Sequence, residues 1–191
     1  MDFLKIFIQS MLIDNVVFIQ YLAICPFIGM TSETGKATGM GLATTFVIVL
    51  ATAVTWPIYC LVMVPFGLEF LQTLIFILVI ASLVQLVEFY LKKSAPALYS
   101  SMGIYLSLIT TNCAVLGITI NCIKKSYNYG QSLVYALGSA AGFLLSMVIM
   151  SGVRAKLKTA DVPKAFRGTP ILYVAAGLLS MAFLGFKGLI K

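Results

Sequence analysis

Charge is what this sequence has least of. Only 10% of its 191 residues are Asp, Glu, Lys or Arg, while 61% are hydrophobic and the mean hydropathy is +1.04. A soluble domain is about a quarter charged and about half apolar. This chain therefore lacks the polar surface that a water-soluble globule needs, and its composition predicts an integral membrane protein.

Long polar connections are also missing. The longest, RAKLKTADVPKAFRGTP at 154–170, is too short to form a soluble domain. The N-terminal apolar run lacks the basic start of a cleavable signal peptide, and Asp14 and Asn15 interrupt it. We therefore expect one membrane domain over residues 1–191, with its function in or at the membrane.

Apolar runs of about 20 residues, which is the length needed to cross a hydrocarbon core of about 30 Å, occur six times along the chain. They cover 3–29, 39–63, 70–91, 99–121, 130–153 and 170–190. The sequence thus predicts an all-α protein with six transmembrane helices.

The chain divides into two halves of three spans each, 1–97 and 98–191. An odd number of spans per half inserts the halves with opposite orientation, as in inverted-repeat membrane folds. The second span of each half is rich in glycine, GMGLATTF at 39–46 and ALGSAAGF at 136–143. We therefore expect two inverted three-helix repeats.

The first span of each half carries a cysteine motif, ICPFIG at 24–29 and TTNCAVLG at 110–117, with a glycine four positions after the cysteine. Pro26 cannot donate a helical hydrogen bond, and residues 110–112 can bond nearby backbone instead. We expect both helices to be broken at these motifs. Broken helices at membrane depth need protein or a cavity to satisfy the freed backbone, so the motifs should face each other inside the protein.

Two thiols in this position have several interpretations. Cys25 and Cys113 could pack as small hydrophobes, as free cysteines generally do, or form a disulfide, although nothing here resembles a secreted cysteine framework. Their symmetric placement beside helix breakers favours thiolate ligation of iron. Cys60 and Cys122 lie outside the repeated motif, and we interpret them as small buried hydrophobes.

Two carboxylates lie within the predicted spans, where ionisable groups are costly and become functional candidates. Asp14 is either a carboxyl group hydrogen-bonded between helices or part of an ion pathway. Glu88 stands four residues before Lys92, which favours a salt bridge at the end of the span, with an ion pathway as the alternative.

The distribution of Lys and Arg predicts the orientation. With the N-terminus outside, inner loops hold 8 of the 13 basic residues and the outer side holds 5, so the positive-inside rule places both termini outside. The inner residues are Lys36, Lys92, Lys93, Arg154, Lys156, Lys158, Lys164 and Arg167; the outer ones are Lys5, Lys124, Lys125, Lys187 and Lys191.

Four segments together carry a family resemblance: LAICPFIGM, GMGLATTFV, LITTNCAVLG and ADVPKAFRG. They resemble the A-subunit family of the Rnf complex, the ion-translocating ferredoxin:NAD⁺ oxidoreductase of bacteria. The likeness extends over essentially the whole chain and includes the six-span layout. Homologous E subunits of the sodium-pumping complex Nqr are similar, but they usually have a longer connection than MVPFGLEFLQ at 63–72.

The resemblance implies a protein of the bacterial inner membrane whose complex couples electron transfer between ferredoxin and NAD⁺ to Na⁺ or H⁺ movement. It implies that Cys25 and Cys113 bind iron, expected as a [2Fe–2S] cluster, at the interface with a homologous E-type protein of the same complex that supplies two further cysteines. Thr110, Thr111 and Asn112 are then expected to hydrogen-bond the sulfur atoms.

Other partners follow from the same resemblance: the Rnf proteins B, C, D and G, and membrane lipid. A nucleic-acid partner is not expected, because a basic cytoplasmic rim facing anionic lipid accounts for the net charge of +7. Flavin and nicotinamide are not expected on this chain, which has no GxGxxG motif after a strand; flavins belong to other members of the complex.

Two alternatives remain open. Inverted repeats with broken helices also describe secondary transporters, so an ion-conducting role without redox chemistry is one. A scaffold that only positions its neighbours in the complex is the other.

Overall fold

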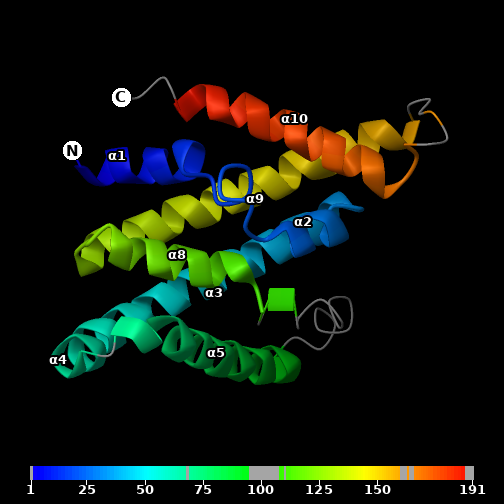
Figure 1. The fold of residues 1–191 in the computed structure, drawn as a ribbon. Helices are drawn as coiled ribbons and strands as arrows, with labels where there is room; N and C mark the ends of the chain where they lie inside the picture. The colour runs from blue at the N-terminus through cyan, green and yellow to red at the C-terminus, as the bar shows by residue number, and fades with distance from the viewer. Residues whose placement is uncertain are drawn as a thin grey trace.

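The computed structural model describes residues 2–67, 69–94, 108–109, 111–159, 163 and 166–187, and within these ranges all regular structure is helical (Figure 1). The elements are α1 (Asp2–Ile8), the π-helical turn η1 (Gln9–Ile13), α2 (Ile24–Met30), α3 (Thr34–Ile58), the π-helical η2 (Tyr59–Met63), α4 (Val64–Phe66), the 3₁₀ turn η3 (Glu69–Leu71), α5 (Gln72–Ser94), α8 (Cys113–Lys124), α9 (Tyr129–Thr159) and α10 (Thr169–Lys187).

Three helical stretches of the described chain are long and apolar enough to cross a membrane: Thr34–Met63, Gln72–Phe89 and Tyr129–Thr159. Shorter apolar helices cover Phe3–Ile13, Cys113–Lys124 and Thr169–Gly185. For the described residues the prediction of an all-helical protein with several long apolar helices is confirmed. Residues 99–107, which begin the fourth predicted span, lie outside the described residues.

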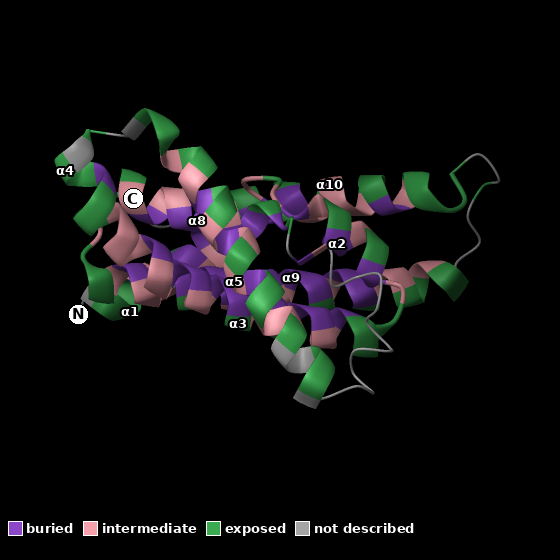
Figure 2. Cartoon of the chain, turned by 90° about the horizontal axis from the view of Figure 1, so that it is seen from below, coloured by how far each residue is buried: buried purple, intermediate pink, exposed green. Residues whose placement is uncertain are grey.

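α3 and α9 lie side by side through the middle of the molecule and form its most extensive helix pair among the described elements (Figures 1 and 2). Small residues permit this approach, since a Cβ added to Gly41 would lie only 3.0 Å from the Leu144 side chain. The buried hydroxyls of Thr44 and Thr52 bond to carbonyl oxygens one turn back, at 2.8 and 2.9 Å. The glycine-rich second spans thus form the core of the fold.

η1 packs against α9 through two of the glycines in ALGSAAGF. A Cβ on Gly142 would lie 2.6 Å from the carbonyl oxygen of Met11, and one on Gly138 would overlap the Ser10 hydroxyl. Only glycine leaves room for this contact between backbones.

The first helix is interrupted, but Pro26 does not cause the break. Regular helix stops at Ile13 and resumes at Ile24, so Pro26 lies in the first turn of α2, where a missing N–H is tolerated. Asn15 causes the break instead. Its Oδ1 accepts hydrogen bonds from the N–H groups of Val17 and Phe18, at 3.1 and 3.3 Å, which takes those donors out of the helical pattern.

α9 and α10 hold the interrupted segment in place. The Asn15 Nδ2 donates to the carbonyl oxygen of Gly142 at 3.1 Å, and the Ser146 hydroxyl donates to Asn15 Oδ1 at 3.1 Å. From α10, the Ser180 hydroxyl donates to the Phe18 carbonyl. The freed backbone of this segment is thus bonded inside the protein, as membrane depth requires.

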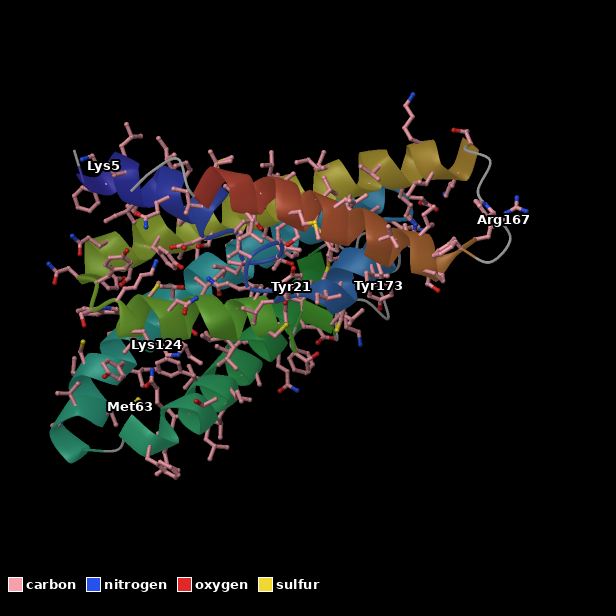
Figure 3. All side chains as sticks on the ribbon, turned by 45° about the horizontal axis from the view of Figure 1, so that its top comes forward. Lys5, Tyr21, Met63, Lys124, Arg167 and Tyr173 are labelled. Atoms are coloured by element: carbon pink, nitrogen blue, oxygen red, sulfur yellow. The ribbon has the colours of Figure 1, made fainter. Side chains whose placement is uncertain are left out.

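The two ends of the bundle differ in their basic residues. The start of α1 and the end of α10 lie at the same end as Lys5 and Lys124, and Arg167 lies at the other end (Figures 1 and 3). This arrangement agrees with the predicted grouping of loops. Which end is cytoplasmic remains a prediction.

Candidate metal centre at the interrupted helices

The two cysteine motifs meet in the middle of the molecule. α2 and α8 begin there and run toward opposite ends of the bundle (Figure 1). The backbone N–H of Ala23 donates a hydrogen bond to the Sγ of Cys113 at 2.9 Å. The break in the first helix therefore contacts the start of the second motif directly.

Both thiols reach the surface of the chain. Cys25 lies in the first turn of α2 and Cys113 is the first residue of α8, and both side chains are exposed. Ala23, just before α2, has a left-handed backbone with φ of 63°, an uncommon conformation for a residue with a side chain. This turn aims its N–H group at Cys113.

Asn112 is the N-cap of α8. Its Oδ1 accepts a hydrogen bond from the Ala114 N–H at 3.0 Å, which is the usual function of asparagine at this position. Its Nδ2 is buried and has no hydrogen-bond partner among the described residues. A sulfur or oxygen acceptor bound at this site would satisfy this buried donor beside Cys113.

The structure describes only one of the other two polar residues of the motif. Thr111 is exposed in the turn before Asn112, while Thr110 lies outside the described residues. The expectation that all three polar residues bond sulfur therefore stays a prediction, with Asn112 as the best placed.

The glycines that follow the cysteines are not equivalent. A Cβ on Gly117 would lie 3.1 Å from the Leu22 side chain, whereas Gly29 has open space around it. Gly117 therefore allows α8 to lie against the interrupted segment, which gives one of the two repeated glycines a packing function.

A cavity of about 540 Å³ opens between α5 and α8, beside Cys113. Gln85 and Glu88 line it from α5, and Thr111, Asn112 and Cys113 line it from the start of α8 and the turn before it. The sequence predicted that Glu88 forms a salt bridge with Lys92 at the end of the span. It gave no sign of this proximity to the cysteine motif, because the two lie on separate helices and no local spacing reports it.

Asp14 forms an ion pair with Lys125, in the turn after α8. The Lys125 ammonium also lies 4.8 Å from the centre of the Tyr135 ring, a cation–π distance. The carboxylate is thus paired with a cation from a distant part of the sequence, a partner that neither interpretation of Asp14 included.

The remaining cysteines lie away from the two motifs. Cys122 is buried, as expected, but Cys60 is exposed on η2, which corrects its interpretation as a buried hydrophobe. Cys122 lies nine residues beyond Cys113 on α8, about 13 Å away by helical rise. Among the described residues there is no cluster of three or more His, Cys, Asp or Glu side chains that could hold a metal ion.

Comparison with known proteins places the chain in a family. Residues 3–190 match the Rnf-Nqr family, described as "Rnf-Nqr subunit, membrane protein". The chain is 50% identical over 189 residues to the protein of Syntrophotalea carbinolica named as the A subunit of an ion-translocating oxidoreductase complex, covering 99% of this chain and 98% of that protein. It is 48% identical over 190 residues to the protein of the same name from Yersinia enterocolitica, covering 100% and 98%. The chain therefore belongs to the Rnf-Nqr family of membrane proteins.

Proposed function

We propose that this chain is the A subunit of an ion-translocating ferredoxin:NAD⁺ oxidoreductase of the bacterial inner membrane. Cys25 and Cys113 supply two of the four ligands of a [2Fe–2S] cluster, and a homologous protein of the complex supplies the other two. The proposal is supported by the hydrogen bond from the Ala23 N–H to Cys113 Sγ, which joins the residue just before α2 to the second motif, and by the exposure of both thiols.

The residues around Cys113 fit a negatively charged iron–sulfur group. Cys113 stands at the N-terminus of a twelve-residue helix, where unpaired N–H groups and the helix dipole stabilise negative charge. The Ala23 N–H already points at its sulfur, and the buried Nδ2 of Asn112 is a further donor without a partner among the described residues. Donors of this kind tune the potential of iron–sulfur clusters.

A second protein is required because iron–sulfur clusters usually have four cysteine ligands. Cys122 lies about 13 Å from Cys113 along α8, and Cys60 lies on η2, directly before α4, which is away from the start of α2 and α8 (Figure 1). Exposed thiols at the chain surface allow a homologous E-type protein of opposite orientation to provide the second pair. When bound, such a cluster carries electrons across the apolar layer, which hydrocarbon side chains cannot do.

The six-span inverted repeat of 1–97 and 98–191 belongs to the same proposal. α2 and α8 start at equivalent motifs and run in opposite directions, and α3 packs along α9, its counterpart in the other half. In the proposed orientation both termini are outside, and the basic 154–167 region faces the cytoplasm, where the soluble parts of the complex reside.

Ferredoxin-dependent NAD⁺ reduction tests the function. Membranes containing the complex with Cys25→Ser should insert and assemble normally but lose this activity, while Cys60→Ser, which replaces an exposed cysteine outside the motifs, should retain it. Full activity in Cys25→Ser membranes would rule out an electron-carrying role and favour a scaffold. Ion uptake by the isolated chain in proteoliposomes would favour the transporter alternative.

Thiol labelling tests the orientation. Lys158→Cys in intact cells should resist membrane-impermeant maleimide added from outside and should react after the cells are opened. Rapid labelling from outside would reverse the assignment of both termini.

A further inference from the structure

A basic cavity lies at the end of the bundle opposite the termini. The last two turns of α9 and the first turn of α10, with the residues just before it, line a space of about 400 Å³. Arg154 and Lys158 contribute from α9 and Arg167 from the turn before α10, and Figure 3 shows Arg167 at this end of the molecule. No carboxylate is among the described residues that line it.

Two of these cations are held by the end of α2. Arg154 Nη1 donates to the carbonyl oxygen of Ile28 at 2.8 Å and to the Thr31 hydroxyl at 3.3 Å. Lys158 Nζ donates to the carbonyl oxygen of Ser32 at 3.2 Å. These acceptors are neutral, so they fix the positions of the cations without compensating their charges. A guanidinium has five N–H donors, which leaves Arg154 donors for a ligand.

One wall of the cavity is apolar, and α10, which forms part of this wall, exposes apolar side chains further along its length. Leu157, Ile171 and Leu172 line the cavity together with the cations. Further along α10, Tyr173 is 59% exposed and Met181 is 71% exposed. A basic pocket at the start of an apolar helix that exposes apolar side chains further along its length matches an anionic headgroup joined to acyl chains.

We propose that this pocket binds the phosphate headgroup of an anionic phospholipid, with the acyl chains lying along α10. Basic pockets between transmembrane helices are known to bind headgroups of this kind. Inorganic phosphate has the same anionic chemistry, but it makes no use of the apolar wall. Because Arg154 and Lys158 also bond the end of α2, the bound lipid would brace the short helix that carries Cys25.

The test uses the intact complex in lipid nanodiscs with a photoreactive phosphatidylglycerol at sub-saturating concentration. Crosslinks should map to peptides containing residues 154–159 and 166–173. Unlabelled phosphatidylglycerol should compete for this site, and phosphatidylcholine and inorganic phosphate should not. Competition by phosphatidylcholine would show a non-specific lipid contact, and competition by inorganic phosphate would show an anion site; either result overturns the proposal.

Two matched double variants test whether lipid binding depends on the positive charges of this pocket. Each basic residue near a membrane surface contributes about 1 kcal/mol to binding anionic lipid, or about a fivefold change in affinity. The double variant Lys158→Gln with Arg167→Gln should therefore weaken crosslinking at this site roughly 25-fold. Lys5→Gln with Lys124→Gln removes the same charge at the other end and should leave the crosslink unchanged. Equal effects of the two double variants would contradict a specific site.

Discussion

The backbone N–H of Ala23 points at the sulfur of Cys113, 2.9 Å away, across 90 residues of sequence. Through this contact, the interrupted segment of the first helix forms part of the environment of Cys113. Anything that keeps the 14–23 segment out of regular helix therefore also shapes the surroundings of Cys113.

Asn15→Ala should destabilise the protein strongly. Asn15 is fully buried and bonds two backbone N–H groups of its own segment as well as Gly142 and Ser146 on α9. Its loss would leave several buried polar groups unpaired, each costing about 1–3 kcal/mol, and we expect a total of about 4 kcal/mol in the free energy of unfolding. Measured in mixed micelles, Asn121→Ala is the control: it removes one partly buried bond to Gln20 and should cost about 1 kcal/mol. Equal losses would mean that Asn15 does not organise the break.

Two glycine-to-alanine substitutions on α9 should have opposite effects on stability, because only one of the two glycines lies in close contact with another backbone. Gly142→Ala would place a Cβ 2.6 Å from the Met11 carbonyl oxygen and should lower stability by about 2 kcal/mol or more. Gly152→Ala, on the same helix with open space around it, should be neutral or stabilising by up to about 1 kcal/mol, because alanine is the better helix former. Thermal unfolding of the two variants provides the comparison, and a stable Gly142→Ala protein would contradict the packing of η1 on α9.

Asn112→Ser should change the iron site while preserving the helix cap. Serine can still accept the Ala114 N–H, but it removes the buried Nδ2 donor, which we expect to bond the cluster. The midpoint potential should fall, by on the order of tens of millivolts, because reduction adds negative charge that the lost donor stabilised. Asn121→Ser, on the same helix, is the control for redox titration. An unchanged potential in Asn112→Ser would mean that its Nδ2 donates elsewhere.

The ion pair between Asp14 and Lys125 should give a measurable coupling free energy between the two side chains. In a double-mutant cycle of Asp14→Asn and Lys125→Gln, we expect a coupling energy of about 0.5–1 kcal/mol, as for partly exposed pairs. Burial favours the neutral amine, but the hydrogen bond to Asp14 and the coulombic attraction of ionised Tyr135 and of Asp14 outweigh it, so the pKa of Lys125 is raised above its ordinary 10.5. The stabilisation is therefore full below about pH 10.5 and is lost as the pH rises through the higher folded pKa. Zero coupling at neutral pH would leave Asp14 available for an ion pathway.

Local sequence patterns predicted the helices well. Hydropathy alone located the long helices, and Thr34–Met63 and Tyr129–Thr159 include the predicted second and fifth spans with a few residues added at one or both ends. Apolar length is a local property that the bilayer imposes, so each span could be recognised without knowing its neighbours. The prediction of a broken first helix is confirmed, but the break lies at 14–23, ahead of the Cys25 motif and not within it.

Long-range contacts could not be predicted in the same way. Asn15, and not Pro26, breaks the first helix, because its amide bonds both its own backbone and a carbonyl 127 residues away. Lys125 pairs with Asp14 across 111 residues, and Glu88 and Cys113 line one cavity only because α5 lies beside α8. No spacing along the chain reports such contacts, although the clustering of Asp14, Asn15 and Gln20 in an apolar span was a signal that this segment is not ordinary helix.

The iron content of the intact complex tests the central claim most directly. The complex should be purified with Cys113→Ser, with Cys25→Ser and with Cys60→Ser, and examined by iron analysis together with the EPR spectrum of the reduced protein. We predict that Cys113→Ser and Cys25→Ser each lose the iron and the signal of one cluster per complex, while Cys60→Ser retains both. Full iron and an unchanged spectrum in Cys113→Ser would contradict iron ligation by this chain.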